Sequence, residues 1–334
     1  MANLRVVFCA LRQMKNISNL ILIILTAAFF GSVSGLSLLG FSRDYFNYDN
    51  LYQEIAIDQD GETKKLNDLL FYYSIKLFSS FFVEFEYFYL FFCLITIGVL
   101  FFGIGLTKTR LFIFLVIWMS LSFGLHYYTQ VRAGLAIAIL ICAFYAQKRL
   151  ITCLLSILAI TAHISALIPV VIYYFALTPR KLKTLILVGF FLSWAFFLLN
   201  RDNLVLSIII NYLPDERLLK YIELLGKGEF TEQNMLAAMP ILQLLATIHI
   251  LARRCILPNY KFEVYLSFAG PVLFYMLSSI PVFAIRGYEL FIPFFIIMIS
   301  RKEYGSIFLY FILFAYLIFG LKSSFFGSLP IIQI

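Results

Sequence analysis

The sequence predicts an all-α polytopic membrane protein, from its composition, its apolar runs and the distribution of its basic residues. Hydrophobic residues make up 62% of the 334 residues, and charged residues make up only 13%. Soluble globular proteins contain about 45–50% hydrophobic residues and about 25% charged residues. So few charges cannot cover a water-exposed surface of this size, so lipid must surround most of the chain. The net charge is +8. In a membrane protein such a surplus of basic residues reports which loops face the cytoplasm, before it suggests binding to nucleic acid.

Apolar runs long enough for membrane-crossing helices occur along the whole chain. A bilayer core needs about 20 apolar residues per helix, with a range of about 17–25. The runs that fit are 19–40, 87–106, 111–127, 131–146, 184–199, 235–252, 264–283, 287–300 and 305–321. A further run, 150–177, is ambiguous because it fits either one long helix or two short ones.

Basic residues decide how run 150–177 crosses, because Lys and Arg resist translocation and collect in cytoplasmic loops. With the N-terminus inside, alternation places Lys148 and Arg149 inside. The basic cluster at 180–183 also belongs inside, which requires run 150–177 to enter the membrane and return, turning near His163. The result is about 11 membrane passes, including a short re-entrant-like helix pair at 150–177. The whole chain, 1–334, is then a single transmembrane domain.

Several familiar classes of protein are excluded. The apolar part of run 19–40 exceeds the roughly 7–15 residues of a secretory signal, so we expect an uncleaved anchor. The five cysteines offer no disulfide framework, since they fall in spans or near the reducing cytoplasm. The sequence contains no CxxC, HExxH, P-loop or GxGxxG motif. It also lacks the internal repeat that marks many transporters.

Two segments on the predicted outer side, 41–86 and 200–234, are long enough to form a cap. The first opens with a polar, tyrosine-rich stretch and continues as an acidic stretch to Asp68. The part from Leu69 to Phe82 is aromatic with one charge, Lys76, as expected of an interfacial helix.

Ionisable residues at the outer ends of spans are the candidates for function. Arg132 opens one span, Arg286 lies between two spans, and His163 lies at the predicted turn. An ionisable group at membrane depth costs about 2.5–3.5 kcal/mol on insertion scales, so it should face a polar cavity or a partner. Arg43 and Asp44 map to the same side, and this convergence favours a site.

Each candidate also has a simpler structural explanation. The two span-edge arginines could snorkel to headgroup phosphates. The histidine could hydrogen-bond a backbone carbonyl, and Arg43 and Asp44 could pair only with each other. Tyr45, Tyr48 and Tyr52 could belong to an interfacial aromatic belt.

Clustered arginines at an outward-facing cavity favour an anion, and the planar guanidinium matches phosphate or carboxylate. At the outer leaflet this anion most naturally belongs to the diphosphate headgroup of a lipid. Neighbouring aromatic and amide side chains suit the faces and hydroxyls of sugars: Tyr45, Tyr48, Tyr52, Asn47, Asn50 and Gln130. The pattern predicts a site for a lipid-diphosphate-linked glycan.

Glycosyl transfer is the reaction that such a site favours. A diphosphate is already a good leaving group, so it does not need the carboxylic acid that glycoside hydrolysis requires. Preorganised arginines would stabilise the developing negative charge. The outer segments lack a compact carboxylate–histidine ligand set, so we expect no metal and no cofactor. His163 or Asp44 is expected to take the proton of the acceptor hydroxyl.

Four short motifs resemble the EpsG/Wzy group of bacterial polysaccharide polymerases. They are RDYFNYDNLY from position 43, QVRAGLAIAIL from 130, AHISALIP from 162 and IRGYE from 285. The resemblance covers almost the whole chain in span order. Some Wzy relatives also carry an Arg followed by ten residues and a Gly in a periplasmic loop, and Arg217 and Gly228 have this spacing.

The resemblance implies an enzyme of the bacterial inner membrane with a GT-C-like helical fold and periplasmic cap loops. It implies transfer of a growing O-antigen or capsule chain from undecaprenyl diphosphate to a new undecaprenyl-diphosphate-linked repeat unit. Expected partners are membrane lipids, a flippase, a chain-length co-polymerase and a ligase or exporter, with no nucleic acid. Catalytic roles are expected for His163, Arg286 and Asp44. Diphosphate or sugar binding is expected for Arg43, Arg132, Tyr45, Tyr48, Gln130, Arg217 and Tyr288.

Three other functions remain open at this point. A lipid-linked oligosaccharide flippase would also need a basic cavity, but with two related halves and charges along the whole path. A membrane O-acyltransferase would use His163 as a base but would draw its acyl donor from the cytoplasm. A polysaccharide ligase would differ only in its acceptor, the lipid A core.

Overall fold

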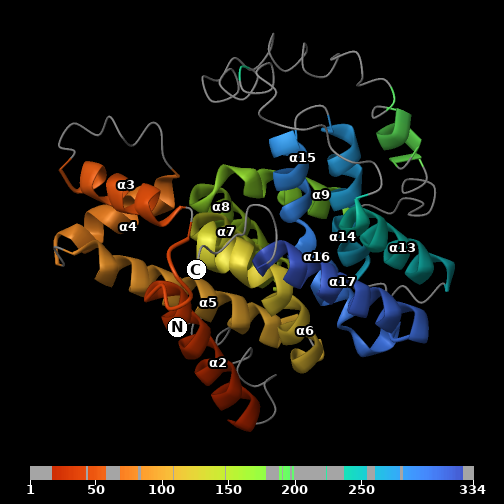
Figure 1. Cartoon of the computed structure of the whole chain (residues 1–334), viewed down its shortest axis with the longest axis horizontal. Coiled ribbons are helices and arrows are strands. Elements are labelled where there is room, and N and C mark those ends of the chain that lie inside the picture. Colours follow the sequence, from red (N-terminus) through yellow and green to blue (C-terminus); the bar gives the residue numbers. More distant parts are fainter. Residues whose placement is uncertain are drawn as a thin grey trace. The chain divides into compact units, whose positions relative to one another are not determined.

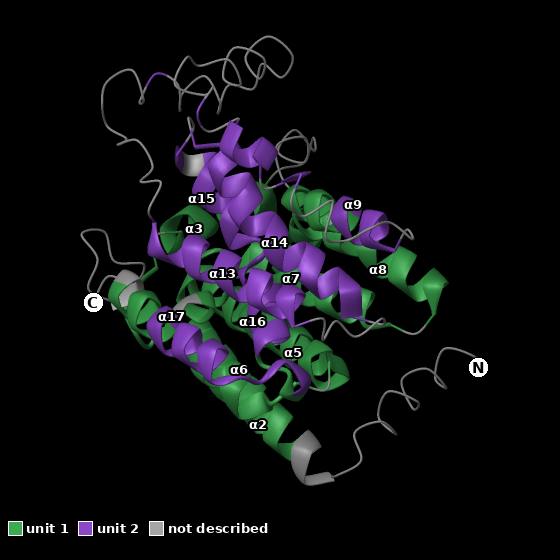
Figure 2. Cartoon of the chain, turned by 90° about the vertical axis from the view of Figure 1, so that its right-hand side faces the viewer, with its two compact units in different colours: residues 1–170, 300–302, 317–334 green, residues 171–299, 303–316 purple. Residues whose placement is uncertain are grey.

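The computed structural model describes residues 17–42, 44–57, 68–81, 84–107, 109–146, 148–177, 237–253, 260–278 and 281–325, with short pieces between 188 and 198 and at 223. Over these ranges the regular elements are helices (Figure 1), which confirms the predicted all-α class. The chain divides into two compact units (Figure 2).

Unit 1 comprises residues 1–170, 300–302 and 317–334. Its elements are α2 (Ile17–Gly35), α3 (Tyr45–Ile57), α4 (Leu69–Ser79), α5 (Phe85–Thr107), α6 (Leu111–Ile117), the π-helix η2 (Trp118–Thr129), α7 (Val131–Phe144), α8 (Arg149–Ala162) and the 3₁₀ turn η3 (Ile164–Ala166). The next helix, α9 (Leu167–Ala176), starts in unit 1 and ends in unit 2. Helix α5 packs against α2 and α7, and α7 packs against α8.

Helix α7 is the centre of unit 1, because all of its residues except Arg132 are apolar and buried. Helix α8 turns a face of small residues inward, including Thr152, Ser156 and Ala159. Small residues on such a face let two helix backbones approach closely, as is common between helices in membranes. Helix α2 uses the same device on α5, since a Cβ at Gly35 would lie 2.6 Å from Cα of Leu90.

Large apolar side chains remain exposed on the outer faces of the helices. Examples are Phe29 on α2, Leu154 on α8 and Phe311 on α17, with exposed fractions of 63%, 57% and 75%. Soluble monomers rarely expose contiguous apolar faces of this kind. These faces are suited to lipid, and they support the reading of the chain as a membrane protein.

Helix lengths do not confirm the predicted number of passes. Among the described residues, α5 alone is long and apolar enough to cross a bilayer by itself. The helical stretches Leu111–Ser120 and Ser122–Thr129 would qualify together as one span bent by 72°. Other apolar helices, such as α7 and α8, are shorter. The count of about 11 passes therefore remains a prediction.

The predicted interruption of run 150–177 is confirmed. Helix α8 ends at Ala162, and His163 has an extended backbone with φ −161° and ψ 125°. The 3₁₀ turn η3 then leads into α9. That the second arm returns to the side from which the first entered stays a prediction.

Unit 2 comprises residues 171–299 and 303–316. Its elements are the end of α9, α13 (Ala238–Ala252), α14 (Lys261–Met276), α15 (Pro281–Glu289), α16 (Ile292–Ile299) and the first part of α17 (Ile307–Phe325). The 3₁₀ turn η6 (Lys302–Tyr304) lies at the boundary between the units. Helix α14 packs against α13, α15 and α16. The side-chain amide of Gln243 donates to the carbonyl of Ser267 over 2.6 Å, which ties α13 to α14.

Candidate functional site

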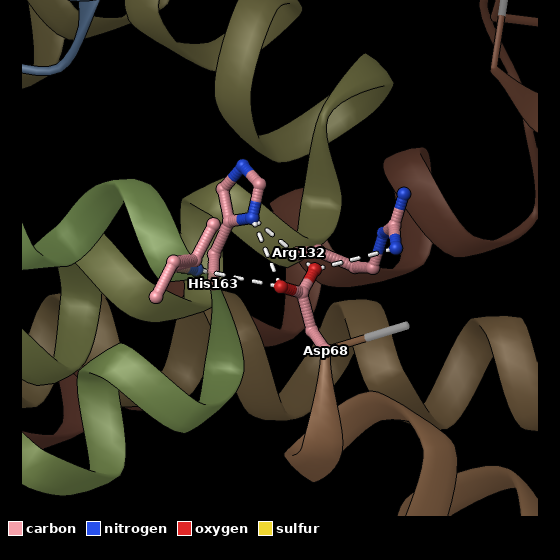
Figure 3. A network of polar contacts seen from close by, with 4 residues as sticks. Asp68, Arg132 and His163 are labelled. Atoms are coloured by element: carbon pink, nitrogen blue, oxygen red, sulfur yellow. Dashed lines mark hydrogen bonds and ion pairs between the residues drawn. The ribbon is translucent and has the colours of Figure 1, made fainter. Parts of the chain in front are cut away.

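Three residues that are far apart in the sequence meet in unit 1 (Figure 3): Asp68, Arg132 and His163. Asp68 immediately precedes α4, Arg132 is the second residue of α7, and His163 occupies the break between α8 and η3. Their side chains are 11%, 29% and 30% exposed, respectively. The group is thus largely covered by protein but still accessible to a ligand.

The histidine is presented by the helix break. The N–H of His163 still donates to the carbonyl of Ala159 over 3.0 Å, so it closes the last turn of α8. Its carbonyl accepts the N–H of Ala166 over 3.0 Å, which opens the 3₁₀ turn. The extended backbone between these two bonds lets the imidazole leave the helix surface and reach Asp68.

The carboxylate of Asp68 is the centre of the group. Nδ1 of His163 lies 3.1 Å from Oδ2 and 3.3 Å from Oδ1 of Asp68. Nη1 of Arg132 donates to Oδ2 over 3.3 Å, and the backbone N–H of Ile164 donates to Oδ1 over 3.3 Å. Burial raises the pKa of Asp68, but the bonds and charges of His163 and Arg132 outweigh it and lower the pKa below 3.8. Asp68 is therefore a carboxylate at neutral pH.

Two aromatic rings hold the guanidinium of Arg132. Its Cζ lies 5.4 Å from the centre of the Tyr48 ring and 5.2 Å from that of Phe71. Both rings are buried. Burial raises the pKa of Tyr48 to about 12, against the opposing effect of the arginine, so its hydroxyl stays neutral. Cation–π contacts of this kind contribute about 0.5–2 kcal/mol and fix the orientation of the guanidinium.

The structure brings together only some of the predicted site residues: Arg132, His163 and Tyr48. Tyr45 and Tyr52 are buried between α3 and α5, where their rings pack on Phe85. They therefore attach α3 to α5, and their predicted contact with sugar stays a prediction. Asn47 and Asn50 are exposed on the same helix.

Asp44 and Gln130 have structural roles at helix starts. The carbonyl of Asp44 accepts the N–H of Tyr48 over 2.9 Å as α3 begins, and Asp44 is not among the residues bonded to His163 or Arg132. The N–H of Gln130 donates to the carbonyl of Leu125, and its carbonyl accepts the N–H of Gly134, both over 2.9 Å. Gln130 thus joins η2 to α7 beside Arg132.

The other candidates lie in unit 2 or outside the described residues. Arg286 is exposed on α15 of unit 2. Tyr288 on the same helix is buried, and its hydroxyl lies 3.1 Å from that of Tyr316. Arg43, Arg217, Gly228 and all of segment 200–234 except Glu223 lie outside the described residues.

Sequence reasoning missed Asp68, which appeared only as the end of an acidic stretch. A local signal was present, since Asp68 directly precedes the apolar run of α4. An aspartate in that position ordinarily suggests an N-cap. The side chain makes no capping bond to α4 and is used by His163 and Arg132 instead.

Within the described ranges no group of three or more His, Cys, Asp or Glu side chains is arranged to hold a metal ion. The chemistry that the three grouped residues can perform is proton transfer at the imidazole and anion binding at the guanidinium.

Comparison with known proteins adds the family. No curated protein and no solved structure matches the chain. The family model described as "EpsG family" matches residues 20–332, which is nearly the whole chain. The apolar helical architecture fits this match, and the protein belongs to the EpsG family, a family of Wzy-type polysaccharide polymerases.

Proposed function

We propose that this protein polymerises lipid-linked oligosaccharide repeat units. The growing glycan is transferred from undecaprenyl diphosphate to a new repeat unit that is itself linked to undecaprenyl diphosphate. The observation that carries the proposal is the grouping of Arg132 and His163 around one carboxylate in a chain of the EpsG family. The reaction takes place at the outer face of the bacterial inner membrane.

Arg132 is the anchor for the donor diphosphate. Its guanidinium is oriented by two rings and by a hydrogen bond to Asp68 over 3.3 Å. A guanidinium has five N–H donors, more than this bond uses, so it can also bind a phosphate. Negative charge accumulates on the diphosphate as the bond to the sugar breaks. A preorganised cation at that position stabilises the charge without help from a metal.

His163 is the base for the acceptor. Nδ1 faces Asp68, and within the described residues Nε2 makes no hydrogen bond. A free imidazole nitrogen is suited to take the proton of a sugar hydroxyl as that oxygen attacks the anomeric carbon. Arg286, on α15, is kept as a second catalytic candidate.

Reconstitution tests the proposal. Purified protein in liposomes receives the lipid-linked single repeat extracted from a strain that lacks the protein. A ladder of longer lipid-linked glycans is expected from the wild type. Arg132→Ala should slow ladder formation by about 10²–10³-fold, and His163→Ala by about 10²–10⁴-fold.

Arg149→Ala is the matched control, because Arg149 is an exposed arginine at the start of α8 and should leave the rate unchanged. Arg286→Ala should also abolish the ladder if Arg286 takes part in catalysis. Movement of single repeats across the bilayer without a ladder would instead indicate a flippase. Addition of one chain to a lipid A core, and to no other acceptor, would indicate a ligase. Acetyl transfer without a ladder would indicate an acyltransferase.

A further inference from the structure

Asp68 contacts both functional side chains and also the backbone beside one of them. Its two oxygens lie within 3.3 Å of Nδ1 of His163, and Oδ1 also accepts the N–H of Ile164 over 3.3 Å. Ile164 directly follows the histidine, so the same carboxylate fixes the ring and the backbone that carries the ring. The side chain of Asp68 is only 11% exposed, which limits competition from water.

The carboxylate also decides which ring nitrogen carries the proton. An ionised carboxylate only accepts hydrogen bonds, so the nitrogen that faces it must be a donor. Nδ1 is therefore protonated, and in the neutral ring Nε2 is the acceptor. Figure 3 shows the second ring nitrogen on the side of the imidazole away from Asp68. Without the carboxylate, the ring could rotate, or its proton could sit on Nε2. A protonated Nε2 cannot accept the proton of the acceptor hydroxyl.

We propose that Asp68 is a positioning residue that holds His163 as a base with Nε2 directed towards the acceptor hydroxyl. This inference rests on the proposed function. In the step, the acceptor oxygen forms a bond to the anomeric carbon while the bond between that carbon and the diphosphate oxygen breaks. The lipid diphosphate leaves with the electron pair, and the hydroxyl proton moves to Nε2. Asp68 takes no proton and stabilises the imidazolium that results.

The contact with Arg132 allows an alternative in which Asp68 acts on donor binding. The guanidinium is bonded to Oδ2, so loss of the carboxylate could also disturb the diphosphate anchor. The rings of Tyr48 and Phe71 still contact Arg132 in that case, because neither contact depends on the carboxylate. The two possibilities differ in kinetics. A disturbed Arg132 weakens donor binding and raises donor KM, whether or not kcat also falls, whereas an effect through His163 lowers kcat and leaves donor KM unchanged.

The test is a double-mutant cycle in the reconstituted polymerase. Asp68→Asn should lower kcat by about 10²–10⁴-fold, because the amide can donate to Nδ1 and select the wrong tautomer. Donor KM should change by less than about threefold. In the His163→Ala background, Asp68→Asn should have no further effect on kcat, since residues that act as a unit are not additive. Asp68→Glu, which keeps the carboxylate, should recover at least about tenfold over Asp68→Asn.

Asp49→Asn is the matched control, because Asp49 is a carboxylate of cap helix α3 whose hydrogen bond is to Gln53, over 3.2 Å. It should leave kcat and KM at wild-type values. A larger donor KM in Asp68→Asn, whether or not kcat also falls, would overturn the inference in favour of Arg132. Multiplying effects of the Asp68 and His163 changes would overturn it too, because the residues would then act separately. A wild type that makes no ladder would overturn the proposed function itself.

Discussion

Gly134 controls how closely the first turn of α7 approaches η2, and replacing it should displace Arg132. A Cβ at this position would collide with the backbone carbonyl oxygen of His126. It would also lie 3.0 Å from the carbonyl carbon of that residue and 3.3 Å from Cδ1 of Tyr127. Both neighbours are 1% exposed or less, so η2 cannot move aside without disturbing packed side chains. The start of α7 must move instead.

The size of the effect follows from this contact. Ordinary carbon contacts lie at about 3.5–4.0 Å, so Gly134→Ala requires a shift on the order of 1 Å. Overpacking of this kind costs about 1–3 kcal/mol in the free energy of unfolding. Arg132 lies two residues away on the same turn. A misplacement of about 1 Å at a positioning group can reduce turnover about 10²-fold.

Gly98→Ala is the matched control, because nothing lies within 4 Å of a Cβ at Gly98 in α5. An alanine there should be neutral or stabilise the helix by up to about 1 kcal/mol. The assay is the midpoint of unfolding in detergent together with the polymer ladder. Wild-type stability and activity in Gly134→Ala would show that the close approach of α7 to η2 does not exist.

Three further outcomes are expected. The pKa of Asp68 in the folded protein is lowered from its ordinary value of 3.8. Its contacts should therefore contribute their full stability above pH 3.8, and this contribution should be lost as pH falls through the folded-state pKa. The unfolding midpoint of wild type should therefore approach that of Asp68→Asn only below about pH 4. Polymerisation should continue in excess EDTA, since arginine supplies the positive charge; loss of activity that Mg²⁺ restores would contradict this. Tyr288→Phe should lower the free energy of unfolding by about 1–3 kcal/mol, because it leaves the buried Tyr316 hydroxyl without its partner. A loss of turnover at unchanged stability would instead place Tyr288 in substrate binding.

The sequence alone was sufficient for the class of protein and for part of the site. With 62% hydrophobic residues and apolar runs along its whole length, the sequence predicted a lipid-embedded helical protein, and the described residues are helical. The basic residues on both sides of run 150–177 predicted an interruption near His163, and the helix breaks at that residue. Arg132 and His163 could be selected because an ionisable residue at a span edge is costly unless it has a partner. The motifs around these residues also indicated the family that the comparison shows.

The partner itself could not be predicted. Asp68 is 95 positions from His163 and 64 from Arg132, and no local pattern carries information about such distant pairs. The same reason applies to Tyr45 and Tyr52, because no local pattern shows that both rings pack on Phe85 of another helix. Likewise, the uninterrupted apolar run at 111–127 gave no sign of a bend of 72°.

Solvent preference and charge are properties of each residue, so composition and order along the chain determine the helices and the ends of the spans. Which charged side chains finally meet depends on how closely the helix backbones approach one another. In unit 1 that distance is set by small residues such as Gly134 and Ala159 on neighbouring helices. Only the folded chain therefore decided that a carboxylate before α4 would lie between a guanidinium on α7 and an imidazole after α8.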